Sequence, residues 1–383
     1  MTDENVKFNF NIIETEKNLK AVVPELNKSA AIAIDLEADS MFNFKEKVCL
    51  IQMAVPGMNL VVDTLKVNNL SALKPLFSNR SIQKIFHGAD YDIRSLFRDF
   101  GIEVNNLFDT ELACRFLGIR ETGLDSVLRD RFNVNVDKRF QKKDWSRRPL
   151  PKEMVDYAAR DAVHLISLAG VLQQELQKKG RLAWVNEECK LLSRVRSIFS
   201  ENEPLFVKCK GAGRLDPRSL AVLEELLKFR LKAAEKKNRP VFKIMSTLTL
   251  HEISRGKPIA VKQLQKLQTV SSKQIGMYGE QIIAAVKRGL KVPEKRLPVY
   301  PRMRSPILKP EIPGRVKAIK EWRDSVAGEL EIDPTMLFNK ALMTAIAVQK
   351  PDNLKSLGKV EGIRNWQRKE FGRNIIEILN RQN

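Results

Sequence analysis

Acidic side chains recur at three places in the first half of the chain, at spacings that could bring them together. Asp35 and Glu37 sit at the end of an apolar, β-branched run, two residues apart, so a strand would place both on one face. Asp92 follows a second apolar run in "KIFHGADYDIRSLF". Tyr157 and Asp161 are four residues apart, which puts a phenol and a carboxylate on one face of a helix. Close carboxylates resist ionising together, so we expect positive charge between them.

Four carboxylates favour hard divalent cations over other cofactors. Such ions prefer oxygen ligands, and a pair of them can hold the attacking and leaving oxygens of a phosphoryl displacement. The three histidines, His87, His164 and His251, are far apart in the sequence, which argues against a zinc site or a histidine-based nucleophile relay. The chain has no GxxxxGK[ST] loop and no GxGxxG after a strand, so an NTPase or dinucleotide enzyme is disfavoured.

Each acidic motif also has an ordinary structural interpretation. Asp-x-Glu at a strand end is often a turn or a helix cap, and Tyr-x-x-x-Asp is often half-buried packing beside a surface acid. The functional hypothesis therefore depends on all three motifs occurring together in this order. The four cysteines show no CxxC spacing and are expected to be reduced core thiols.

The positive charge of the protein is confined to its second half. Residues 1–170 carry 24 Lys/Arg and 24 Asp/Glu, whereas residues 171–383 carry 43 and 22, which accounts for the whole net charge of +21. Such an excess indicates a polyanionic partner, most often nucleic acid, although a generic basic surface would produce the same count.

The elements that must position these acids form an α/β pattern. Five runs read as strands and five as helices, which predicts an α/β domain with a mixed sheet. The predicted strands are residues 8–13, 31–36, 48–54, 59–63 and 83–87, and the predicted helices are 15–27, 70–77, 91–100, 109–117 and 153–178. Beyond residue 185 the pattern becomes helical to the end of the chain.

The helical half contains an internal repeat. "KFRLKAAE" (228–235) aligns with "EWRDSVAG" (321–328), and "YGEQIIAAVKR" (278–288) aligns with "FGRNIIEILNR" (371–381), both at an offset of 93 residues. We expect two small all-helical modules, with Phe229 and Trp322 as core anchors. Between them, "VPEKRLPVYPRMRSPILKPEIP" holds six prolines and is predicted to be a semi-rigid basic linker.

With these motifs in place, the chain resembles the ribonuclease D branch of the DEDD 3′-to-5′ exonucleases. The matching segments are "IDLEADS…KVCLIQMA", "FHGADYDIRSL" and "DWSRRPLPKEMVDYAARDAVHL", and the tyrosine of the last one is typical of the DEDDy subclass. "LFDTELACRFLG" resembles the strand and helix that follow the second motif in this family. The helical repeats resemble HRDC modules.

The resemblance implies a ribonuclease H-like α/β exonuclease domain with a mixed sheet, followed by two all-α HRDC modules. The implied divisions are an exonuclease domain at 1–205, HRDC modules at 206–291 and 311–383, and a linker at 292–310.

It also implies the roles of the site residues. Asp35, Glu37, Asp92 and Asp161 would hold two divalent ions, Mg²⁺ or Mn²⁺, with Asp35 between them, and Tyr157 would orient the attacking water. The expected activity is 3′-5′ exoribonuclease trimming of tRNA precursors and other small structured RNAs, releasing nucleoside 5′-monophosphates.

The remaining expectations concern partners and location. The basic loop at 136–150 has interleaved aromatics, so it could grip a strand by phosphate contacts and stacking, or could be a solvated connection. Lysines and arginines of the HRDC modules are expected to bind nucleic-acid backbone. We expect a cytoplasmic monomer without a membrane segment. A 3′-5′ DNA exonuclease acting on single strands in repair, and a non-catalytic nucleic-acid-binding protein, remain the alternatives.

Overall fold

The computed structural model describes residues 9–196, 203–301 and 309–381, and the chain divides into two compact units. The first unit consists of Met1–Ala38, Val48–Ser197 and Pro306–Asn383, and the second of Asp39–Lys47 and Ile198–Ser305. The first unit thus combines the N-terminal α/β part with the last helical module. The four-part division at 205, 291 and 310 stays a prediction.

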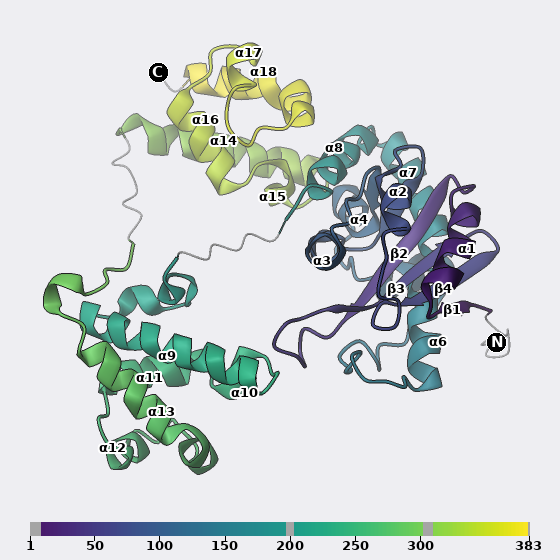
Figure 1. The fold of residues 1–383 in the computed structure, drawn as a ribbon. Helices are drawn as coiled ribbons and strands as arrows, with labels where there is room; N and C mark the ends of the chain where they lie inside the picture. The colour runs from purple at the N-terminus through teal and green to yellow at the C-terminus, as the bar shows by residue number, and fades with distance from the viewer. Residues whose placement is uncertain (1–8, 197–202, 302–308, 382–383) are drawn as a thin grey trace. The chain divides into compact units, whose positions relative to one another are not determined.

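A mixed six-stranded sheet forms the centre of the first unit (Figure 1), which confirms the predicted fold class. Its strands, in the spatial order β1-β4-β3-β2-β5-β6, are β1 Asn11–Ile13, β4 Met58–Asp63, β3 Val48–Val55, β2 Ala31–Ala38, β5 Gln83–Phe86 and β6 Leu107–Asp109. Only β3 runs antiparallel to its neighbours; β1 is parallel to β4, and β2, β5 and β6 are mutually parallel. The strands are largely buried because their residues are apolar on both faces.

Helices surround the sheet (Figure 1). They are α1 Glu16–Leu26, α2 Leu73–Ser78, α3 Asp90–Phe100, α4 Thr110–Leu117, α5 Leu124–Phe132, α6 Lys152–Asp161, α7 Leu165–Lys178 and α8 Leu182–Leu192. Two predictions are wrong in detail. Periodicity missed the short α5, and the single helix expected at 153–178 is two helices, because α6 packs on β3 and β4 whereas α7 packs on α4, β2 and β5. Residue 8 of the first predicted strand lies outside the described residues.

The two helical modules repeat the same elements 93 residues apart. In the second unit these are α9 Pro217–Lys236, α10 Val241–Ile244, α11 Thr247–Gly256, α12 Val261–Lys266 and α13 Ser272–Leu290. In the first unit they are α14 Glu311–Glu329, α15 Pro334–Leu337, α16 Lys340–Gln349, α17 Leu354–Leu357 and α18 Asn365–Arg381. Phe229 is a buried core residue and Trp322 packs against the core of its module, as predicted.

The linker predicted at 292–310 is only partly described, since residues 302–308 lie outside the described ranges. Its first part carries a short 3-10 turn, Glu294–Arg296. The Tyr300 hydroxyl then donates a hydrogen bond to the Val207 carbonyl at 3.1 Å, so the start of the linker packs on the first helical module.

The second helical module docks on α8 of the α/β part. The Trp184 and Trp366 rings stack with centroids 4.7 Å apart. The Glu187 carboxylate accepts hydrogen bonds from the backbone N–H groups of Asn365 and Trp366, at 2.7 and 3.0 Å, and thereby caps the N-terminus of α18. Glu188 accepts a hydrogen bond from the Trp366 indole N–H at 3.0 Å.

A second set of contacts joins the ends of α4 and α14. Buried Arg181 donates to the carbonyl oxygens of Phe116 and Leu330, each at 2.8 Å, so one guanidinium binds the C-terminal ends of two helices. Gly118 has φ +86°, and a Cβ there would lie 2.1 Å from the Glu331 carbonyl oxygen. The seam therefore requires glycine at this position. None of the described helices is long and apolar enough to cross a membrane.

Candidate active site

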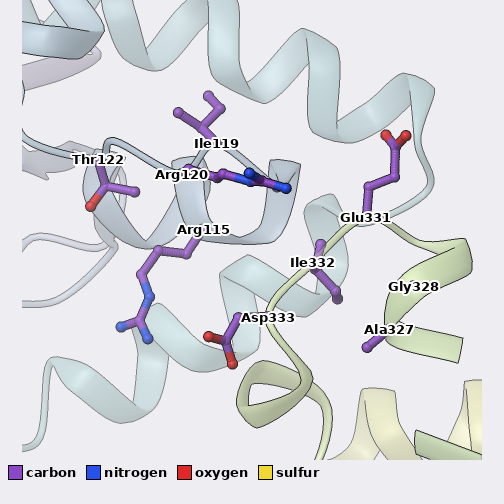
Figure 2. Close-up of a pocket in the computed structure, with 10 residues that line it drawn as sticks. Arg115, Ile119, Arg120, Thr122, Ala327, Gly328, Glu331, Ile332 and Asp333 are labelled. Atoms are coloured by element: carbon purple, nitrogen blue, oxygen red, sulfur yellow. The ribbon is translucent and has the colours of Figure 1, made fainter. Parts of the chain in front are cut away.

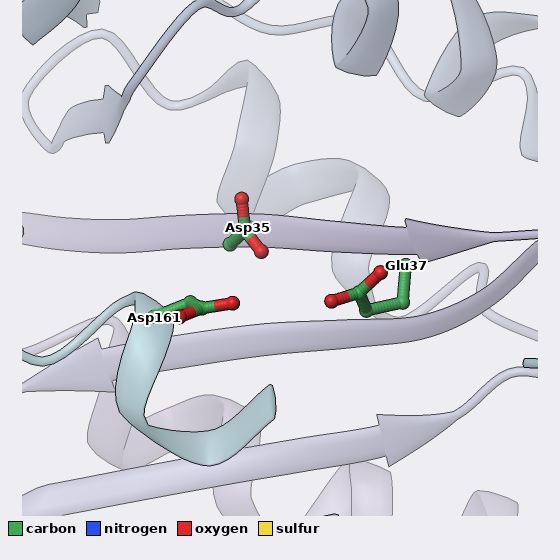
Figure 3. Close-up of side chains that lie close together, drawn as sticks. All are labelled: Asp35, Glu37 and Asp161. Carbon is green, nitrogen blue, oxygen red and sulfur yellow. The ribbon is translucent and has the colours of Figure 1, made fainter. Parts of the chain in front are cut away.

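Three of the predicted acids meet in the first unit. Asp35 and Glu37 project from the same face of β2, since they are two residues apart in an extended strand. Asp161 is the last residue of α6, the helix that packs over β3 and β4. One carboxylate oxygen from each of the three lies within 4.8 Å of the others. Figure 3 shows the side chains of Glu37 and Asp161 directed toward one another beside Asp35.

The fourth predicted acid, Asp92, lies close to this cluster but outside the group of three. It occupies the first turn of α3 and is 8 % exposed. The charge of Asp92 contributes to raising the pKa of Glu37, and the charge of Asp35 contributes to raising the pKa of Asp92. Asp92 therefore interacts electrostatically with Asp35 and Glu37, and its assignment as a fourth metal ligand stays a prediction.

Burial dominates the protonation of these acids. It raises the pKa of Asp35 to about 7, although the Leu36 backbone N–H acts in the opposite direction. Burial and then the charge of Asp35 raise the pKa of Asp161 to about 8. For Glu37 and Asp92 the pKa lies well above its ordinary value, again through burial first and neighbouring carboxylates second. The cluster is thus short of positive charge.

The donor set fits divalent metal ions. None of the four carboxylates forms an ion pair with lysine or arginine among the described residues, and all four offer the hard oxygen ligands that Mg²⁺ and Mn²⁺ prefer. Gln52, which pairs with Asp35 across β2 and β3, is 1 % exposed, and neither of its amide atoms has a hydrogen-bond partner in the described part of the chain. Buried polar atoms at the base of a carboxylate cluster are consistent with a site built for a further group.

Tyr157 faces the cluster from α6. Tyr157 and Asp161 are one helical turn apart on α6, and each side chain affects the pKa of the other. Burial, followed by the charges of Asp161, Glu37 and Asp35, raises the pKa of the phenol above its ordinary value, so it stays protonated. The ring packs edge-on against Phe140 and stacks with Trp145, at centroid distances of 5.7 and 6.1 Å.

Those contacts correct the expectation for the loop at 136–150. Trp145 is 1 % exposed and belongs to a core cluster with Met154 and Ala158, so it cannot stack on a nucleobase. Arg148 fixes this part of the loop through two hydrogen bonds to the Asp63 carboxylate, at 2.6 and 2.7 Å. The aromatic residues of the loop hold Tyr157 in place; they do not form an open stacking surface.

Asp109 fixes the turn that precedes α3, the helix that carries Asp92. The sequence did not reveal this role. Its carboxylate accepts from the backbone N–H groups of Gly88 and Ala89, at 2.9 and 2.8 Å, and also caps α4. Gly88 has φ +76°, and a Cβ there would lie 2.8 Å from the Glu111 carboxylate. The aspartate of "DTE", directly before α4, was the available sequence signal for the capping role, since an aspartate before a helix is a typical N-cap.

The cluster opens into a cavity of about 450 Å³. Its lining includes Asp35, Glu37, Tyr157 and Asp161, together with residues not singled out from the sequence as site residues: His87, Glu111, Thr122, Asp125, Lys138 and Gln141. Lys138, from the basic loop, forms an ion pair with Asp125 at 2.7 Å. The cavity lining is thus mainly acidic, so a phosphate-bearing ligand would need bound cations to enter it.

A separate cavity of about 720 Å³ lies at the seam between α4 and α14 (Figure 2). Arg115 and Arg120 line it from the α/β part, and Glu331 and Asp333 from the second helical module. Thr122 lines this cavity and the one at the carboxylates, so the two share a wall. The arginines and the acids that line this cavity come from opposite sides of the seam. Their mutual attraction favours docking of the second module over ligand binding.

Models of known protein families match most of the chain. A family model described as 3′-5′ exonuclease matches residues 10–177, and the HRDC domain model matches residues 219–286 and 313–379. The matched segments contain the carboxylate cluster and the two helical modules, respectively.

Individual relatives agree with the family models. Ribonuclease D of Nitrobacter hamburgensis is 30 % identical over 77 % of this chain and 78 % of its own length. The crystal structure of Escherichia coli RNase D, described as an exoribonuclease involved in structured RNA processing, aligns with a TM-score of 0.75 and 25 % identity over 98 % of this chain and 99 % of that one. The catalytic core of RRP6 from Trypanosoma brucei aligns with a TM-score of 0.66 and 28 % identity, covering 76 % and 82 % of the two chains. The chain therefore belongs to the ribonuclease D family of 3′-5′ exoribonucleases.

Proposed function

We propose that this exoribonuclease removes nucleotides singly from a free 3′-hydroxyl end and releases nucleoside 5′-monophosphates, with tRNA precursors and other small structured RNAs as substrates. The observation that carries the proposal is the set of partly or fully buried carboxylates that line one cavity with Tyr157. The description of the E. coli relative as acting in structured RNA processing supports the substrate class.

Asp35, Glu37, Asp92 and Asp161 would hold two divalent cations, Mg²⁺ or Mn²⁺. When bound, such ions supply the positive charge that stabilises the attacking and leaving oxygens of phosphodiester hydrolysis. The protein contributes a buried, low-dielectric position in which this charge acts strongly. The raised pKa values of the carboxyl groups imply that protons and cations compete for the same oxygens.

Tyr157 orients the nucleophile. Because its phenol stays protonated, it acts as a hydrogen-bond donor and acceptor and is unsuited to act as a base at neutral pH. Phe140 and Trp145 fix its ring, so the hydroxyl points to one place beside Asp161. A water held there would be positioned for in-line attack on the terminal phosphodiester.

The first helical module is the stronger candidate for backbone binding outside the catalytic cavity. Lys232 and Lys236, one turn apart on α9, line a groove of about 750 Å³ that also includes Tyr278. At the corresponding positions, 93 residues later, the second module has Ser325 and Glu329. Electrostatic attraction to phosphate is therefore expected from the first module. A cytoplasmic monomer remains our prediction.

The test is a time course with Mg²⁺ or Mn²⁺ on two 5′-labelled substrates, a tRNA with a short 3′ extension and a single-stranded DNA of equal length. We expect the RNA to shorten stepwise from its 3′ end. Asp35→Ala and Asp92→Asn should abolish shortening, whereas Asp90→Asn, which removes an exposed acid paired with Arg94, should not.

Three outcomes would contradict the proposal. Equal or faster shortening of DNA would support a DNA exonuclease. Binding of both substrates without shortening would support a non-catalytic protein. Retention of more than about a tenth of the wild-type rate by Asp35→Ala would reject the metal-ligand assignment.

A further inference from the structure

A second polar groove lies beside α8, at the edge of the sheet formed by β5 and β6. Its volume is about 490 Å³. Segments from three parts of the first unit line it: the loop before β5, the loop before β6 and the C-terminal half of α8 with the following turn. The lining residues are Arg80, Gln83, Asn105, Asn106, Leu107, Asn186, Lys190, Ser193 and Arg194.

The lining carries positive charge without compensating acids. Arg80, Lys190 and Arg194 are exposed, and none of their side chains has an ion pair or hydrogen bond among the described residues. Among the residues that the structure describes, no aspartate or glutamate lines the groove. Its other side chains are mainly amides, which can donate to phosphate oxygens and to ribose or base edges. This composition is the opposite of that of the carboxylate cavity.

One helix connects the groove to the docking of the second module. Asn186 and Lys190 are four residues apart and lie on one face of α8, and Arg194 follows in the next turn. The contacts of Trp184, Glu187 and Glu188 with the second module fix the helix. The backbone that carries Lys190 is thus held in place before any ligand binds, which lowers the entropic cost of binding.

The opposite wall is also fixed. The Asn106 side chain donates to the Arg80 carbonyl oxygen at 3.0 Å, and the Asn105 side chain donates to the Ser78 carbonyl oxygen at 3.0 Å. Beneath this loop, the fully buried Lys84 ammonium donates to the carbonyl oxygens of Asn79 and Ile82. The backbone that carries Arg80 is therefore held from two sides.

We propose that this groove binds phosphate groups of the RNA backbone at a distance from the 3′ end that is cleaved. This inference rests on the proposed function. Gln83 pairs with Ala31, four residues before Asp35 on β2, so the groove begins roughly 13 Å along the strand direction from the first metal ligand. The groove thus contacts the body of a structured RNA while the terminal nucleotide occupies the carboxylate cavity.

The test compares two triple variants of the full-length chain. One variant, Arg80→Gln/Lys190→Gln/Arg194→Gln, removes the cations of the groove. The matched control, Lys17→Gln/Lys20→Gln/Lys340→Gln, removes three exposed lysines outside it. Binding of a tRNA with a 3′ extension is measured between 50 and 200 mM salt, in an Asp35→Ala background that prevents degradation. Cleavage of a trinucleotide is measured in the background with an intact Asp35.

We expect the groove variant to bind the tRNA about tenfold more weakly than the control. The slope of log K against log salt concentration should become shallower by about 2 to 3, because three phosphate contacts are lost. Trinucleotide cleavage should match that of the control, since a trinucleotide does not reach the groove. Equal affinity and equal salt dependence in the two variants would overturn the inference.

Two further outcomes are informative. If the protein with an intact Asp35 fails to cleave the trinucleotide, the proposed function fails, independently of the binding result. Binding of 5′-AMP is measured as well, because a free mononucleotide offers the same phosphate chemistry. If the groove variant loses 5′-AMP binding but keeps its tRNA affinity, the groove is a mononucleotide site and the RNA assignment is wrong.

Discussion

Trp184 and Trp366 stack at 4.7 Å, which makes the second HRDC module part of the same compact unit as the exonuclease domain. The stack is surrounded by directional contacts, since Glu187 caps α18 and Glu188 binds the Trp366 indole. A seam with these features resembles the interior of a domain more than a transient interface between domains.

Replacing Trp366 by alanine should therefore destabilise the first unit by about 3 to 5 kcal/mol, the usual cost of truncating a buried tryptophan. Denaturant unfolding measures the change. The control is Phe242→Ala in the first module, where the side chain is 50 % exposed and little loss is expected. A loss below about 1 kcal/mol for Trp366→Ala would show that the stack contributes little.

Tyr157→Phe should lower the single-turnover rate on RNA by about a hundredfold, because the ring stays packed while the orienting hydroxyl is lost. Its melting temperature should stay close to that of the wild type. Tyr91→Phe, on exposed α3 surface, serves as the control and should retain full activity. A Tyr157→Phe rate within about threefold of wild type would remove the hydroxyl from the mechanism.

The metal-free protein should become less stable as the pH rises from about 4 to 8. The pKa values of Asp35 and Asp161 are about 7 and about 8 in the folded state, against an ordinary value of 3.8 for aspartate, so the folded state binds more protons in this window. Their stabilising contribution is complete below the unfolded pKa and is lost as the pH passes the folded values. Thermal unfolding at a series of pH values in chelator measures this trend.

Adding Mn²⁺ or Mg²⁺ should reverse the loss, and more strongly at pH 8 than at pH 6, because the ions compete with protons for the same oxygens. Saturation at a hundred times the dissociation constant would contribute about 2.7 kcal/mol. Asp35→Asn should reduce both the pH trend and the metal effect. An equal metal effect in that variant would place the ions elsewhere.

Gln52→Met should lower activity without lowering stability. Both amide atoms of Gln52 are buried without a partner among the described residues, so an apolar side chain of similar size should leave stability unchanged or raise it by about 1 kcal/mol. Activity should fall about tenfold, because the amide faces the Asp35 side of β3 and a buried unpaired polar group is most readily explained by function.

The control is Gln173→Met, which removes an amide that donates to Gln83 at 2.9 Å and should therefore lower stability. Full activity of Gln52→Met would leave its unpaired amide without a functional explanation.

Much of the exonuclease fold was predictable, because β-branched runs and the Asp35, Glu37 and Tyr157, Asp161 spacings report local geometry directly. The break between α6 and α7 was not, since both helices are apolar on one face and only tertiary packing assigns them to different parts of the sheet. The burial of Trp145 was missed for a similar reason: a basic, aromatic loop has the same composition whether its rings face the core or the solvent. The role of Asp109 depends on contacts with Gly88 and Ala89, about 20 residues away in sequence.

The two HRDC copies differ at the residues that contact the exonuclease domain, so one copy cannot replace the other at this seam. The hydrogen-bond donors to Glu187 are Asn365 and Trp366, and 93 residues earlier the first module has Ser272 and Lys273 at these positions. A chimaera carrying the first module twice would present an ammonium group to the face of Trp184 in place of an indole. The second copy thus has the residues that support the exonuclease domain, whereas the first has Lys232 and Lys236 where the second has Ser325 and Glu329.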